Sequence, residues 1–246
     1  MKKNRMRKAF LLPAVYLMLT GAAFPGHSAY LHKKWSYAVQ TDTGRTLAPY
    51  FIAPTTGKKT PNPDGFIQRW LLLEPINKPN RTNTVFTYTY LNTAFNTEYF
   101  PNQFTILPKD GETVKAGEQE LTWHALETNN FNVKLFRFAY GYYKHTYAVL
   151  FWAVTVVNSP REMKNVRLAA GSNGASIWWV NSKEALLLEG DRRMVMDDGV
   201  SNRLTLNKGK NIIRVALING PGLSDFCVRF LDEKGVPVKD LTISYQ

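Results

Sequence analysis

The residues that could carry out catalysis stand apart from one another in this chain. Three histidines follow the first 29 residues, and only His124 sits beside a predicted strand, where a general base could act. The G-x-S-x-G motif that presents a nucleophilic serine is absent. Glycoside hydrolysis needs two facing carboxylates, and the sequence does not pair those near strand ends. These are Glu74, Glu98, Glu184 and Glu189. The sequence therefore predicts no catalytic constellation, and a structural role is favoured for His124.

Metal and thiol chemistry find equally little support. Dispersed histidines do not offer the clustered ligands of a zinc site. Asp197-Asp198-Gly199 offers carboxylates that could bind calcium, and a solvated turn is the favoured interpretation. Cys227 is the only cysteine and lies in an alternating strand pattern, which indicates a buried thiol. We therefore expect no cofactor, with calcium as the one ion left open.

The sequence offers more candidate residues for ligand binding than for catalysis, and the first of them are the tandem pair Trp178-Trp179. Neighbouring residues of a strand point to opposite faces, so one ring can fill a core while the other needs a different use. Val180 suits a core better than Asn181, which assigns Trp178 to the core and Trp179 to the surface. The alternative for Trp179 is cover by a neighbouring loop.

Sugars present apolar C–H faces to aromatic rings and hydroxyl groups to polar side chains. The sequence therefore suggests a carbohydrate site at Trp179, with four polar residues in the same region. A second aromatic and basic surface is expected at Tyr140–Lys144, on a loop or strand end. The predicted carbohydrate-binding residues are Trp179, Asn181, Asp191, Arg192, Arg193, Tyr142 and Tyr143.

Short apolar segments separated by turn signals predict an all-β sandwich. Phe66–Leu73 is expected to be a strand that Pro75 ends, and Tyr147–Val157 a central strand that is buried on both faces or crosses the sandwich. Asn83–Phe95 fits a strand or a short helix. Phe131–Leu135 is expected in the strand series.

The first residues form a basic head followed by the apolar run Ala9–Phe24 and small residues, which is typical of a secretory signal peptide. Five of the basic residues precede position 9, so the net charge of +12 falls to about +7 (12 − 5) after cleavage. We expect a signal peptide over 1–29, an extended segment over 30–64 and a sandwich over 65–246. The mature chain is expected to be secreted or periplasmic, without a lipid anchor, a transmembrane segment or bound nucleic acid.

Three motifs carry a family resemblance: Gly171–Ala175, Trp179–Ser182 and Leu204–Ile213. They resemble the turns of galactose-binding-like jelly-roll sandwiches, including the protective-antigen type, that accompany secreted polysaccharide-degrading proteins. Proteins grouped with acetylxylan esterases are also similar. Asn173 and Gly174 stand where calcium-binding relatives carry aspartates.

The resemblance implies a jelly-roll fold and a non-catalytic accessory role in polysaccharide processing. The partners it implies are a polysaccharide or oligosaccharide and a carbohydrate-active enzyme or surface complex. An acetylxylan-type carbohydrate esterase is the alternative, and a structural interaction domain of a cell-surface complex is the second.

Overall fold

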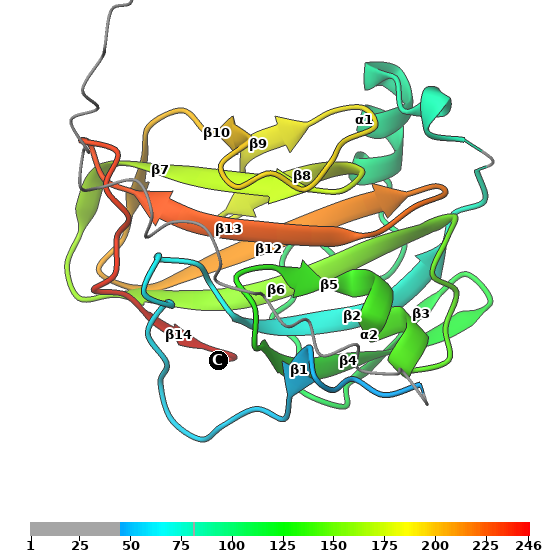
Figure 1. Cartoon of the computed structure of the whole chain (residues 1–246), viewed down its shortest axis with the longest axis horizontal. Coiled ribbons are helices and arrows are strands. Elements are labelled where there is room, and N and C mark those ends of the chain that lie inside the picture. Colours follow the sequence, from blue (N-terminus) through cyan, green and yellow to red (C-terminus); the bar gives the residue numbers. More distant parts are fainter. Residues whose placement is uncertain (1–44, 81) are drawn as a thin grey trace, which may run out of the picture. The chain divides into compact units, whose positions relative to one another are not determined.

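Two antiparallel sheets build the computed structural model, which describes residues 45–80 and 82–246 (Figure 1). The predicted signal peptide lies outside these residues. The larger sheet has the order β1 (Phe51–Ile52), β4 (Gln119–Thr128), β2 (Arg69–Asn77), β6 (Val149–Ser159), β12 (Gly209–Asn219), β8 (Ala175–Val180) and β9 (Lys183–Leu188). Two more strands join it, β3 (Thr113–Ala116) on β4 and β14 (Thr242–Ser244) on β6. The smaller sheet has the order β10 (Gly199–Val200), β7 (Met163–Ser172), β13 (Asp225–Leu231) and β5 (Val133–Lys134), with β11 (Leu204–Leu206) also on β7.

The two sheets confirm the predicted all-β sandwich. Short helical segments interrupt the strands: the 3-10 turn η1 (Asn83–Val85), α1 (Tyr88–Asn96) and α2 (Leu135–Gly141). No helix in the described part of the chain has both the length and the apolar character needed to cross a membrane.

The central strands of the larger sheet are buried on both faces. Every residue of β6 from Val149 to Val157 is buried, and so is every residue of β2 from Arg69 to Ile76. This confirms the prediction for the apolar run in β6. A strand can be apolar on both faces only when each face has its own cover.

A first core therefore lies between the two sheets. Trp70 of β2 and Trp178 of β8 both meet Phe226 of β13 edge to face, with ring centroids 4.9 and 5.4 Å apart. Such aromatic pairs stabilise a core beyond the area that they bury.

A second core lies on the opposite face of the larger sheet. It contains Trp123, Trp152 and Trp179, and it is closed by α1 and by residues 97–108, which we call the covering loop. Phe100 of this loop meets both Trp123 and Trp152 edge to face at 6.2 Å. The larger sheet is thus a middle layer between the smaller sheet and this cover.

Three local expectations are corrected or resolved by the structure. Pro75 does not end its strand, because β2 passes it with a register shift between Leu73 and Ile76. Only Val133–Lys134 of the predicted strand Phe131–Leu135 pairs with a neighbour, and the chain then turns into α2. The ambiguous segment Asn83–Phe95 is helical.

Residues 45–64 lie against the larger sheet at a buried ion-pair cluster. β1 pairs with the end of β4, and Lys59 forms a bridge to Ile243. Glu127 of β4 accepts hydrogen bonds from Lys59 and Arg69 at 2.7 Å each and from the Thr55 hydroxyl at 2.6 Å. Burial alone would raise the pKa of Glu127, but these donors outweigh it and lower the pKa from 4.5 to about 2.

This lowered pKa predicts a specific loss of stability in acid. A carboxyl whose pKa is depressed by folding stabilises the protein above its unfolded pKa, and the stabilisation disappears as the pH falls toward the folded value. From pH 5 to pH 2, the free energy of unfolding should therefore fall by on the order of 3 kcal/mol more in the native protein than in Glu127→Gln, as measured by urea denaturation.

Glu120→Gln is the matched control, because Glu120 lies on the same strand, is exposed and forms no ion pair with the described residues. It should retain the native pH dependence. An equal pH dependence of Glu127→Gln and the native protein would contradict this role of the cluster.

Candidate functional site

The tandem tryptophans divide between the two cores. Trp178 is fully buried in the first core, and its indole nitrogen donates to the Ser176 hydroxyl at 3.1 Å. Trp179 points to the opposite face, as predicted, but its expected exposure is wrong, because only 7% of it is accessible. It stacks on Trp152 at 5.3 Å with the rings 9° from parallel. Trp179 is therefore not available as a surface ring for a sugar.

The covering loop explains the burial of Trp179. Phe104 of this loop lies edge-on to Trp179 at 5.9 Å and to Trp152 at 5.7 Å. Arg214 of β12 is the cross-strand neighbour of Trp179, and it donates to the carbonyls of Thr105 and Ile106 at 2.6 and 2.8 Å. A buried arginine thus fixes the loop to the sheet beside Trp179. Burial lowers the pKa of Arg214 to about 10, so it remains charged at neutral pH.

The structure separates the other residues predicted near Trp179. Asn181 lies in the turn before β9, where its amide donates to Asn211 at 2.8 Å and accepts from the Ile212 amide at 2.9 Å. Asp191, Arg192 and Arg193 follow the other end of β9, a strand of six residues. At about 3.3 Å per residue, its two ends lie roughly 17 Å apart or more. Sequence proximity therefore does not place these residues in one site.

The acidic turn is engaged in ion pairs. Asp197 binds Arg229, whose Nε lies 3.0 Å from its carboxylate, and Asp198 pairs with Arg192. Within the described residues, no group of three or more His, Cys, Asp or Glu is arranged to hold a metal ion. Cys227 is buried, which raises the pKa of its thiol to about 12 and makes a nucleophilic role unfavourable.

His124 belongs to a packed cluster. Its Nε2 lies 3.4 Å from Glu74, which also accepts from Lys144 at 2.9 Å. Its ring stacks on Tyr142 at 3.8 Å and meets Phe138 at 5.7 Å. Burial lowers the pKa of His124 and so favours the neutral ring. No serine hydroxyl is hydrogen-bonded to this ring in the part of the chain that the structure describes.

Tyr142 therefore lies in a packed environment. It is half-buried between His124 and Phe138, which differs from the open surface predicted for it. Its pKa is raised by burial.

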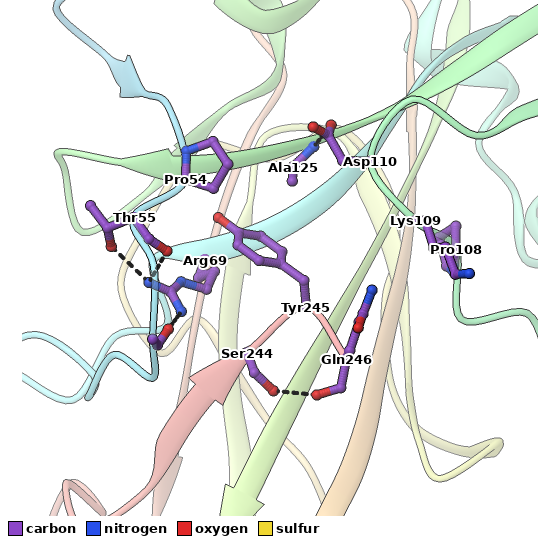
Figure 2. Close-up of a pocket in the computed structure, with 11 residues that line it drawn as sticks. Pro54, Thr55, Arg69, Pro108, Lys109, Asp110, Ala125, Ser244, Tyr245 and Gln246 are labelled. Carbon is purple, nitrogen blue, oxygen red and sulfur yellow. Dashed lines mark hydrogen bonds between the residues drawn. The ribbon is translucent and has the colours of Figure 1, made fainter.

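A pocket of about 330 Å³ lies at Tyr245, between residues 54–57, the start of β2 and residues 108–110 (Figure 2). Several of its polar groups already have partners within the fold, although the buried Tyr245 hydroxyl has none among the described residues. Arg69 donates to Thr55 and Glu127 and lies 5.1 Å below the Tyr245 ring, while Asp110 accepts from the Ala125 amide at 2.7 Å. Figure 2 shows the hydrogen bonds from Arg69 to Thr55 and from Ala125 to Asp110. The arrangement is that of a structural cluster.

A different surface carries exposed aromatic rings. It is formed by α2 and the residues after it, at the right-hand side of Figure 1, together with Arg45. Tyr143 is 73% exposed and Tyr147 51% exposed, and Phe136 contacts both Tyr140, at 6.2 Å, and Tyr147, at 5.7 Å. We call this set the tyrosine surface: Arg45, Phe136, Tyr140, Tyr143 and Tyr147.

The pattern of α2 explains how the surface is displayed. Leu135, Phe138 and Ala139 are buried, a spacing of three and four residues that faces one side of a helix. Phe136 and Tyr140, four residues apart, therefore stack with their rings 9° from parallel on another side.

Tyr143 follows α2 in the left-handed region, with a φ of 59°. Its amide donates to the Tyr140 carbonyl at 3.2 Å, and the Lys144 amide donates to Ala139 at 2.9 Å. A bulky residue in this conformation is strained, and such strain is concentrated at functional sites. Of the predicted site residues, Tyr143 is the one that the structure presents as an open aromatic ring.

Comparison with known proteins adds little to this geometry. No family model matches the chain, and no curated protein matches it. A sugar-binding PA14 domain of an RTX adhesin aligns at 9% identity and a TM-score of 0.37, over 71% of this chain and 96% of that one. The PA14 domain of the MpAFP antifreeze protein gives 8% and 0.36, over 78% and 96%. A β-glucosidase from Kluyveromyces marxianus gives 21% and 0.30, over 45% of this chain and 13% of that one.

With TM-scores below 0.5, these likenesses leave the function to be argued from the chain's own residues. Membership of the protective-antigen type of family stays a prediction. The class that the fold itself defines is an all-β sandwich with a second core on the outer face of its larger sheet.

The burial of Trp179 predicts that its removal affects stability. Trp179→Ala should lower the free energy of unfolding by about 3–5 kcal/mol, because it leaves a cavity against Trp152 and Phe104. Trp179→Phe keeps an aromatic ring and should cost less. Urea denaturation of both variants measures the difference. An exposed ring would change stability by only about 0.5 kcal/mol or less, so a change that small for Trp179→Ala would contradict its burial.

Proposed function

We propose that this chain is a non-catalytic carbohydrate-binding module, and that it holds a polysaccharide on the tyrosine surface. The observation that carries the proposal is the exposed ring of Tyr143, held outward by a strained backbone at the end of α2. The ring offers a flat apolar face of the kind on which the C–H face of a sugar can lie.

The burial of the tryptophans supports this choice of surface. All five tryptophans in the described part of the chain are at most 7% exposed: Trp70, Trp123, Trp152, Trp178 and Trp179. Tyrosines therefore supply the most exposed rings in that part. Tyr147 contacts Phe136, which stacks on Tyr140, and Arg45 lies over both Tyr140 and Tyr143. Tyr88 stands apart, at the start of α1. A binding site needs such grouped rings more than a single one.

The esterase alternative lacks an equivalent observation. His124 has a carboxylate partner, but its remaining ring contacts are Tyr142 and Phe138. Acyl transfer through a triad requires a serine within hydrogen-bond reach of the histidine. Binding without catalysis is therefore the function that the geometry favours.

The predicted signal peptide would export the chain to the periplasm or the cell exterior, where polysaccharides are found. There the module would act as an accessory to polysaccharide processing, beside a carbohydrate-active enzyme or in a surface complex.

Substitution of the exposed ring tests the proposal. Tyr143→Ala should lower the affinity for the bound polysaccharide about tenfold, because stacking contributes on the order of 1–1.5 kcal/mol. The loss is measured as weaker retardation of the protein in affinity gels that contain plant or bacterial polysaccharides. Its urea denaturation curve should stay close to that of the native protein, since the side chain is 73% exposed.

Tyr88→Ala is the matched control. Tyr88 is 61% exposed and lies on α1, away from the proposed surface in sequence and in its contacts. It should leave retardation unchanged. Equal losses in both variants, or no retardation of the native protein by any polysaccharide, would count against binding at this surface.

A further inference from the structure

We infer that the tyrosine surface selects anionic polysaccharides, and that Arg45 binds the carboxylate of a uronic acid residue stacked on Tyr143. This inference rests on the proposed function and names its ligand class. It comes from the position of one guanidinium group and from the charges around it.

Arg45 is held between two rings of the surface. Its guanidinium carbon lies 4.9 Å from the centroid of Tyr140 and 4.8 Å from that of Tyr143. Cation–π attraction of this kind orients the group through its faces. Among the described residues, its N–H groups form no hydrogen bond and no ion pair, and Arg45 is exposed. An oriented cation with free donors thus lies over one face of the Tyr143 ring, and the opposite face is the one left for a sugar.

The other cations near this surface differ in this respect. Lys144 pairs with Glu74 at 2.9 Å, and Lys134 pairs with Asp225 at 2.7 Å. Their charge is largely compensated within the fold. Arg45 therefore carries the charge that remains for a ligand.

The stretch of chain that carries the tyrosines of this surface contains no acidic residue of its own. Residues 128–161 include no Asp or Glu. This stretch contains all of α2 and the turn that carries Tyr143. The positive charge of this aromatic surface therefore comes from Arg45, and it favours an anionic ligand and disfavours a cationic one.

A uronic acid matches both features of the surface. Its ring has a C–H face for stacking, and its carboxylate is attached directly to that ring. Because Arg45 covers one face of the Tyr143 ring, a sugar ring would stack on the opposite face and extend its carboxylate past the rim of the tyrosine toward the guanidinium. Arginine can donate two parallel N–H bonds to a carboxylate, and this geometry distinguishes it from lysine. A neutral sugar would use the ring alone.

A pair of matched polymers tests the inference. Polygalacturonate and its carboxyl-reduced form share one backbone and differ in the charged group. By affinity electrophoresis and calorimetry at about 50 mM salt, the native protein should bind polygalacturonate at least tenfold more tightly than the reduced polymer. Arg45→Gln should lower affinity for polygalacturonate about tenfold or more and leave the reduced polymer unaffected, because charge-assisted hydrogen bonds contribute more than neutral ones. Arg45→Lys should restore only part of the loss.

Arg193→Gln removes an equal charge from an exposed position outside the surface and should have little effect. Equal binding of both polymers that is lost in Tyr143→Ala would overturn the inference and keep the proposed function. Binding that Tyr143→Ala leaves intact would overturn both. Equal losses in Arg45→Gln and Arg193→Gln would show attraction by net charge and overturn the inference. A preference for a sulfated polymer over polygalacturonate would overturn it as well, because the ligand group would then be sulfate.

Discussion

The larger sheet is apolar on both faces, and the rest of the fold follows from this constraint. Leu71 and Leu72 of β2, like Trp152 and Ala153 of β6, are neighbours that point to opposite sides, and each is at most 1% exposed. A sandwich of two sheets covers only one face of each. The outer face of the larger sheet therefore requires a third layer, and α1 with the covering loop supplies it. Burying an apolar side chain contributes about 1.5–3 kcal/mol, so losing that layer would expose a large unfavourable area.

Two buried arginines attach irregular segments to the sheet. Arg214 holds the covering loop through two backbone carbonyls, and Arg69 holds residues 55–57 together with Glu127. Irregular backbone leaves N–H and C=O groups without the partners that they would have inside a sheet or a helix. A guanidinium group offers five donors, which suits it to gather several such acceptors at once. Packing thus favours the third layer, and the arginines fix its position.

The strands were more predictable from the sequence than the contacts between distant segments. The continuous apolar run of β6 signalled burial on both faces, and alternation correctly sent Trp178 and Trp179 to opposite sides. Whether the second ring met solvent or protein depended on the covering loop, which lies more than 70 residues earlier in the chain. No local pattern encodes that contact. For the same reason, Asn181 and Asp191 looked close in sequence although β9 separates them.

The helix α2 was not predicted from the sequence, yet its own residues explain why it forms. Its seven residues are too few for stability in isolation, and aromatic residues favour strands by propensity, so the segment resembled a loop or strand end. Burial of Leu135, Phe138 and Ala139 overrides that preference and holds the helix on the sandwich. Once it is held, Phe136 and Tyr140 must point away from the core, and the left-handed turn at Tyr143 projects the next ring outward. Buried residues of α2 therefore hold the tyrosine surface in position. The exposed rings are not needed to hold the helix, so they can contact a ligand.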